Sequence, residues 1–158
     1  MTPTDLVHAS RDCYAFEDHP WCCMTGVAEE LKARRPDARF VLTVRDPEAW
    51  WASVHNWVAL KAPRRAEYAA LLHAEPLRKD TAIAAVQAHN AHVRGMFRGK
   101  DAWRLIEVNV MEEDGAALSR KLCAFLNLTD EPRCERAFPQ KNAAAYAGAP
   151  HRARARRR

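Results

Sequence analysis

The sequence predicts an α/β fold in which helices cover a parallel sheet, and two observations lead to this prediction. Segments with helical apolar spacing alternate with short β-branched runs, in the order helix, strand, helices, strand, helix. The run FVLTV at 40–44 is almost unbroken in its apolar character, as expected of a parallel strand covered on both faces. A doubly wound sheet usually has four or more strands, so two predicted strands indicate an incomplete architecture.

The first half of the chain is expected to form a helix over about 21–34, a strand over 39–44 and a helix over 47–60. The first helix has Met24, Val27, Ala28 and Leu31 on one face, and the Arg-Pro-Asp turn at 35–37 ends it. Asp46 is a typical N-cap and Pro47 a typical first helical residue. The helix that they begin carries an apolar stripe at Trp50, Val54, Trp57 and Val58.

Two prolines, Pro63 and Pro76, delimit a short helical stretch over 64–73. A longer helix is expected from about 77 to 98, a strand over 104–110 after the turn at 99–101, and a last helix from Asp114 and Gly115. The apolar positions of the longer helix are Ile83, Val86, Val93 and Phe97, with Asn90 on the same stripe, and those of the last helix are Leu118, Leu122, Phe125 and Leu126.

The net charge of +5 comes from the C-terminus. Five of the 25 basic residues are arginines in the last eight positions, which leaves 20 basic residues to balance the 20 acidic ones. We therefore expect one domain over 1–150 and a basic, disordered tail over 151–158. A charge run alone does not read bases or grooves, so a solvated end without a partner is favoured over a weak contact with nucleic acid or an anionic membrane, and no specific nucleic acid is expected.

The five cysteines form no C-x-x-C pair, so a zinc ribbon and a complete disulfide framework are both disfavoured. Cys123 lies on an apolar helical face and is expected to be a small core residue. A bridge from Cys123 to Cys134 is sterically conceivable, but the sequence alone does not establish it. Neither an N-terminal signal peptide nor a membrane-spanning segment is present in this chain, so reduced thiols and a cytoplasmic location are the default expectations.

The most informative segment is the strand–turn–helix over 39–53. Arg45 stands at the carboxyl end of the predicted strand, and Ser53 follows eight residues later in the helix. In open α/β sheets the carboxyl ends of the strands are where ligands bind. A guanidinium and a hydroxyl at this edge suit a phosphate group, so we predict an anion clamp. The alternative is a strand-end arginine paired with Asp46 or Glu48.

The same segment, VRDPEAWWAS at 44–53, resembles the P-loop-type sulfotransferases that use 3′-phosphoadenosine 5′-phosphosulfate. Their pattern reads F-I-L-T-V-R-D-P-x-x-W-x-x-S, and residues 40–53 match it closely. Further similar segments, within an overall resemblance over about 12–142, are DHPW at 18–21, RRPDARF at 34–40, LCAFLNL at 122–128 and FPQKN at 138–142.

The resemblance implies a three-layer P-loop-like fold with a parallel sheet, incomplete at its N-terminus. It implies that Arg45 and Ser53 hold the 3′-phosphate of the donor, 3′-phosphoadenosine 5′-phosphosulfate. It also implies transfer of a sulfuryl group to a hydroxyl or amine of a small-molecule or glycan acceptor, without a metal. The family's glycine-rich phosphosulfate loop has no counterpart here, since Gly26 is the only glycine in residues 1–40. The alternative is a non-catalytic sulfotransferase-like binding or scaffold domain, or a fragment without activity.

Other side chains are weaker candidates. Asp18 or His19 is a candidate catalytic base, although a capping role for Asp18 and a surface role for His19 are favoured. His89 and His92 have the spacing of two metal ligands on a helix, but no third ligand is evident, and no metal site is predicted. Stacking on adenine is conceivable for three aromatic residues, which are otherwise expected in the core: Trp50, Trp51 and Trp57.

Overall fold

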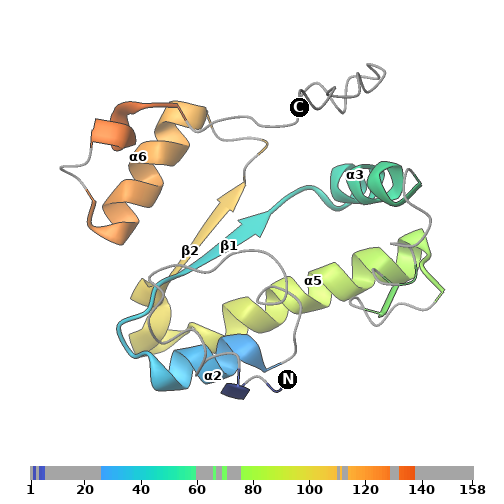
Figure 1. Ribbon diagram of the computed structural model, residues 1–158, viewed down its shortest axis with the longest axis horizontal. Helices are drawn as coiled ribbons and strands as arrows, with labels where there is room; N and C mark the ends of the chain where they lie inside the picture. The colour runs from blue at the N-terminus through green and yellow to red at the C-terminus, as the bar shows by residue number, and fades with distance from the viewer. Residues whose placement is uncertain are drawn as a thin grey trace, which may run out of the picture. The chain divides into compact units, whose positions relative to one another are not determined.

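The computed structural model describes residues 2, 4–5, 26–59, 66, 69–70, 76–109, 111, 114–128 and 132–137. The chain divides into two compact units, Met1–Asn109 and Val110–Arg158. Mixed helices and strands with a parallel sheet confirm the α/β class (Figure 1). The predicted boundary between residues 150 and 151 lies outside the described residues.

The sheet of the first unit consists of two described strands, β1 (Phe40–Val44) and β2 (Leu105–Asn109). They run parallel, with Phe40 paired to Leu105 and Val44 paired to Asn109. A parallel pair needs a long crossover, and helices α3 (Pro47–Ala59) and α5 (Lys79–Met96) lie within it. The strands therefore end at the same edge, where Arg45 follows β1.

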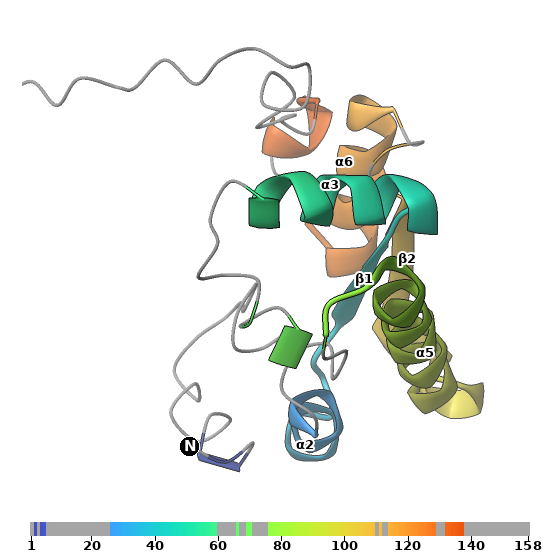
Figure 2. The same cartoon turned by 90° about the vertical axis from the view of Figure 1, so that its right-hand side faces the viewer.

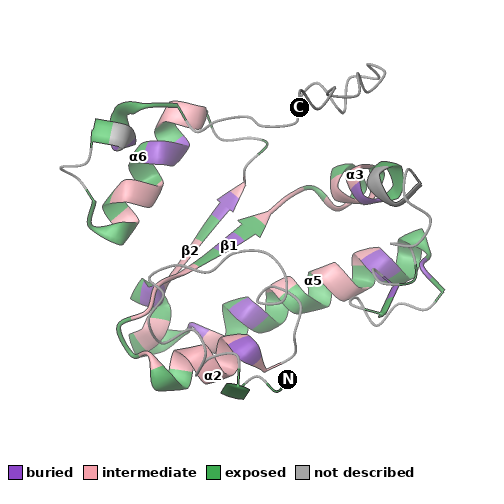
Figure 3. Ribbon diagram, viewed as in Figure 1, coloured by how far each residue is buried: buried purple, intermediate pink, exposed green. Residues whose placement is uncertain are grey.

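Helix α5 covers one face of the sheet (Figure 1). Val93 and Phe97 at its C-terminal end form a buried cluster with Leu42 of β1, and the Phe97 ring lies 4.6 Å from that of Phe40 between centroids. The predicted stripe on this helix is confirmed at Val93 and Phe97, which are both buried. Figure 3 shows buried stretches in purple on α5 and on the strands. Alternate residues of a strand point to opposite faces, so Val41 lies on the other face of β1.

Coverage of β1 differs from the prediction. Val41 is 43% exposed and Thr43 is also exposed, so the described elements of the first unit cover this strand on one face and not on both. On β2 the neighbour of Thr43 is Val108, which is only 1% exposed. The apolar run at 40–44 gave the strand correctly, but β-branched residues favour strands on exposed faces as well as buried ones.

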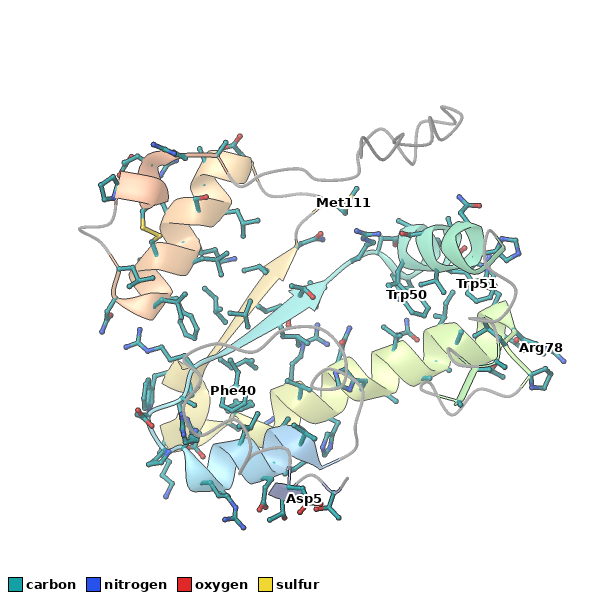
Figure 4. All side chains as sticks on the ribbon, in the orientation of Figure 1. Asp5, Phe40, Trp50, Trp51, Arg78 and Met111 are labelled. Carbon is teal, nitrogen blue, oxygen red and sulfur yellow. A yellow bond between two sulfur atoms is a disulfide. The ribbon has the colours of Figure 1, made fainter. Side chains whose placement is uncertain are left out.

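Helix α3 packs against the N-terminal part of α5 and lies across its direction, as Figures 1 and 2 show together. The buried residues of this contact are Val54, Ala69, Leu77 and Ala82. Trp50 and Trp51 pack against them and point from α3 toward α5 in Figure 4. This packing anchors α3, and with it the turn after β1.

Helix α2 (Val27–Arg34) is joined to the start of both strands by Arg104, which is only 4% exposed. Its guanidinium donates hydrogen bonds to the carbonyl oxygens of Lys32, Arg35 and Ala38, at 3.2, 2.6 and 3.0 Å. The carbonyls at the C-terminal end of a helix lack intrahelical partners, and Arg104 supplies donors to them. Arg104 ends a 3₁₀ helix, η1 (Gly99–Arg104), at the place where a simple turn was predicted.

The second unit contains α6 (Gly115–Leu126) and a 3₁₀ helix, η2 (Pro132–Glu135). Helix α6 begins where the sequence predicted, and Asp114 caps it, since its carboxylate accepts hydrogen bonds from the backbone N–H groups of Ala116 and Ala117, both at 3.0 Å. Leu118 is buried, but Leu126 is 42% exposed, so the predicted stripe does not extend to the end of the helix.

Cys123 and Cys134 form a disulfide that joins α6 to η2. The expectation of reduced thiols is therefore wrong for this pair, and Cys123 is a bridging residue and not a free core thiol. Sequence spacing could not decide the matter because it does not give the distance between two Cα atoms. Here that distance is 5.8 Å, which is usual for a bridge.

Candidate functional site

The candidate site is the turn between β1 and α3, and Asp46 organises it. The Asp46 carboxylate accepts a hydrogen bond from the Ala49 N–H at 2.9 Å, and its backbone carbonyl accepts one from the Trp50 N–H at 2.8 Å. Asp46 thus satisfies the first turn of α3 in the way that the sequence predicts for an N-cap. Because Pro47 then begins the helix, Arg45 is held at the carboxyl end of β1, one residue before the cap.

Arg45 is half-buried and has no ion-pair or hydrogen-bond partner in the part of the chain that the structure describes. The alternative pairing with Asp46 or Glu48 is not present. Asp46 caps α3, and the Glu48 carboxylate lies 2.6 Å from the ammonium group of Lys79. Within the described part of the chain, this edge therefore carries a cation that no ion pair or hydrogen bond engages, as an anion-binding site requires.

Ser53 lies two helical turns into α3 and is half-buried. It shares the strand–turn–helix with Arg45, and in the sequence of α3 it lies between Trp51 and Val54, which both belong to the contact with α5. The predicted pairing of these two side chains around one phosphate stays a prediction.

Asn109 is a residue at this edge that the sequence analysis did not single out. It is the last residue of β2, and the parallel register places it beside Val44, next to the strand end from which Arg45 leaves. The signal was present, because a polar residue closes an otherwise apolar strand end at Val108 and Asn109. An amide at this position adds a neutral donor and acceptor to the edge.

Trp50 and Trp51 of α3 contribute to the core. Trp50 and Trp51 pack against Val54 and its buried neighbours, and the Trp51 ring lies 5.6 Å from the His55 ring between centroids. The expectation of core packing is thus confirmed for Trp50 and Trp51. The side chain of Trp57 lies outside the described residues.

His89 and His92 lie on α5 opposite α2, and Glu29 of α2 meets them there. The His92 Nε2 atom is 2.6 Å from a Glu29 carboxylate oxygen. Partial burial raises the pKa of Glu29, but the hydrogen bond from His92 and the nearby imidazoles outweigh it, so the pKa lies below its usual value. Partial burial lowers the pKa of His89, and His92 lowers it further. Among the described residues no group of three or more His, Cys, Asp or Glu side chains is arranged to hold a metal ion.

An open depression of about 460 Å³ lies at the other end of the strands. Most of its charged groups have partners: the Lys32 ammonium group lies 2.8 Å from the Asp101 carboxylate and donates to the Met96 carbonyl, and Arg104 is bound to carbonyls. The hydrogen bond from Lys32 lowers the pKa of Asp101, which remains ionised. Lys100 also lines this surface, but the paired carboxylates make it a poorer candidate for an anion site than the turn after β1.

The described helices include none long and apolar enough to span a membrane. Asp18 and His19, the candidate bases, lie outside the described residues. Gly26 is described, and it occupies the left-handed region at φ 86° immediately before α2. The single glycine of the first 40 residues therefore serves a helix start, and it does not belong to a glycine-rich loop.

The chain is thus an α/β protein, and its candidate anion-binding site lies at the carboxyl edge of the sheet. An arginine at a strand end and the capped helix that follows it form this site. Comparison with protein families matches residues 1–79 to the sulfotransferase domain family, which is half of the chain and includes Arg45 and Ser53. The chain belongs to the sulfotransferase domain family, as the sequence resemblance indicated. No curated protein and no solved structure matches it.

Proposed function

We propose that the chain binds the adenosine 3′,5′-bisphosphate portion of 3′-phosphoadenosine 5′-phosphosulfate, with Arg45 and Ser53 on the 3′-phosphate. The observation that carries this proposal is the half-buried Arg45 at the carboxyl end of β1, which has no ion-pair or hydrogen-bond partner among the described residues. Family membership supports it, because the matched segment includes the whole strand–turn–helix. A guanidinium forms charge-assisted and often bidentate bonds with phosphate, and a hydroxyl adds a neutral donor.

The reaction that accompanies this binding is sulfuryl transfer. The bond between sulfur and the bridging oxygen of the donor breaks, a bond forms between sulfur and the acceptor hydroxyl or amine, and adenosine 3′,5′-bisphosphate leaves. The acceptor proton passes to a base, for which Asp18 and His19 are the candidates in the sequence. The acceptor class is a small molecule or glycan that carries a hydroxyl or amine.

The binding step is tested by isothermal titration with adenosine 3′,5′-bisphosphate and with adenosine 5′-monophosphate. A phosphate–arginine interaction contributes about 1.5–3 kcal/mol, so Arg45→Ala should weaken binding of the bisphosphate about 10- to 100-fold. Binding of the monophosphate should change little, because that ligand lacks the 3′-phosphate. Arg98→Ala is the matched control, since it removes the same charge from an exposed residue at the other end of the strands.

Equal affinity of wild-type protein and Arg45→Ala for the bisphosphate would refute the clamp. Ser53→Ala should give a smaller loss, because a neutral hydrogen bond contributes about 0.5–1.5 kcal/mol.

A non-catalytic binding domain is the second candidate, and a specific observation favours it. Gly26, the one glycine before residue 41, starts α2, so backbone donors of a glycine-rich loop are not available from it. Incubation with donor labelled in the sulfuryl group and a panel of simple phenols, alcohols and amines separates the two candidates. Labelled product that requires Arg45 supports the enzyme, whereas bisphosphate binding without any transfer supports the binding domain.

A further inference from the structure

We propose that the disulfide between Cys123 and Cys134 is a redox-sensitive cross-link that orders the second unit of the chain. Oxidation holds η2 against α6, and reduction releases η2 and loosens α6. The proposal is independent of the nucleotide site, which lies in the other unit.

The two described helices of the second unit are short. Helix α6 has 12 residues and η2 has four. Isolated helices of about 12–15 residues are marginal in water even with favourable sequences, so α6 requires tertiary contacts. A single 3₁₀ turn such as η2 has even less stability of its own.

Few described residues of this unit are buried, and the bridge includes one of them. Cys134 is 3% exposed, and the buried residues of α6 are Leu118 and Ser119. Leu126 at the end of α6 and Leu128 just beyond it are 42% and 48% exposed. Among the described residues, little apolar surface is therefore buried near the end of α6, so the covalent link is the main connection that we assign to η2 there.

The end of α6 prepares Cys123 for the bridge. Asn127 adopts the left-handed conformation at φ 58°, and the Leu128 N–H donates to the Cys123 carbonyl at 2.8 Å. This is the hydrogen-bond pattern of a Schellman motif, which turns the chain sharply at a helix end. The turn directs the chain back along the helix, so that Cys134 meets Cys123 across a separation of 11 residues.

Formation of the bond needs an oxidant of the disulfide class, such as oxidised glutathione. One cysteine thiolate attacks glutathione disulfide, which gives a mixed disulfide and one glutathione thiolate. The second cysteine thiolate then attacks the protein sulfur of the mixed disulfide and expels a second glutathione. Two protons leave the protein thiols, and the two electrons reside in two reduced glutathione molecules. A dithiol such as dithiothreitol reverses the exchange.

The pairing is tested by mass spectrometry of the full chain, equilibrated with oxidised glutathione, blocked with an alkylating agent and digested with trypsin without reduction. Cleavage after Lys121, Arg133 and Arg136 yields peptide 122–133 joined to peptide 134–136. The triple variant Cys13→Ser, Cys22→Ser, Cys23→Ser is the control, and it should give the same linked peptide. Absence of this peptide from both proteins would overturn the proposal.

Hydrogen exchange of the backbone amides of α6 then measures how much the disulfide orders this helix. Because a disulfide that closes a short loop stabilises a fold substantially, these amides should exchange about tenfold faster or more after reduction. Reduction of the triple variant should give the same increase, and Cys134→Ala should exchange rapidly without reductant. Equal exchange rates in the linked and reduced proteins would show that the bond orders nothing, and the proposal would be wrong.

Discussion

The guanidinium of Arg104 is nearly inaccessible to solvent, and all its partners are backbone carbonyls or Asp101. The Arg104 guanidinium carbon also lies 5.6 Å from the centre of the Phe40 ring and 5.9 Å from that of Phe97. A buried charge costs free energy unless it is hydrogen-bonded, and here each nitrogen of the guanidinium donates to at least one carbonyl. Arg104 therefore links the end of α2 to the beginning of both strands.

Replacing Arg104 by Met should destabilise the protein by about 2–4 kcal/mol, because the carbonyls that it binds lose charged donors in a buried place. Arg104→Lys should recover only part of this loss, since an ammonium group cannot reach three carbonyls in a planar fork. Urea unfolding followed by tryptophan fluorescence measures the change. Arg98→Met, which alters an exposed arginine, should stay within about 0.5 kcal/mol of wild type. An unchanged midpoint for Arg104→Met would contradict the assigned role.

Asn127 shows how one residue can depart from a family pattern without a change in structure. The family ending L-C-x-F-L-G has Gly where this chain has Asn127. The residue lies at φ 58° and ψ 41°, which is the left-handed region that glycine adopts freely and asparagine tolerates better than other residues. The dihedral angles explain why asparagine is compatible with the helix end that the structure has at this position.

At the scale of elements, α3 depends on its first turn. Asp46→Ala removes the acceptor of the Ala49 N–H and should cost about 1 kcal/mol of the free energy of unfolding. Asp46→Asn keeps an acceptor at the same place, so its free energy of unfolding should fall by no more than about 0.3 kcal/mol. Urea unfolding of the three proteins in parallel provides the measurement. If Asp46→Ala and Asp46→Asn were equally stable, the cap would contribute nothing.

The sequence predicted the helices and strands well, but it did not predict which of their residues are exposed or cross-linked in the fold. Asp46 and Pro47 predicted the start of α3 to the residue, because a cap is a local interaction. The exposure of Val41 and the bridge from Cys123 to Cys134 could not be read in the same way, since both depend on parts of the chain distant in sequence. The same holds for the candidate site. Arg45 and Ser53 came from one segment, whereas the position of Asn109 beside Val44 follows only from the strand pairing.

For the protein as a whole, acid should lower the free energy of unfolding through the cluster of Glu29, His89 and His92 between α2 and α5. The pKa of His89 is lowered by partial burial and by His92, although the Glu29 carboxylate opposes this. The unfolded chain therefore binds more protons than the folded chain as the pH falls through about 6.5, the ordinary pKa of histidine. The free energy of unfolding must then decrease as the pH falls. The lowered pKa of Glu29 acts in the same direction below about pH 4.5, where the unfolded carboxylate is protonated first.

The slope of stability between pH 7.5 and 5.5 reports on His89. A full proton of difference gives about 1.4 kcal/mol per pH unit, and the contribution of His89 should be a fraction of this because its site is open to solvent and screened. The variant His89→Gln should have a flatter profile than wild type over this range, and His55→Gln should not, since His55 lies on α3 away from Glu29. Urea unfolding at half-unit pH intervals measures the three profiles. Parallel profiles for wild type and His89→Gln would mean that the cluster of Glu29, His89 and His92 does not couple protonation to folding.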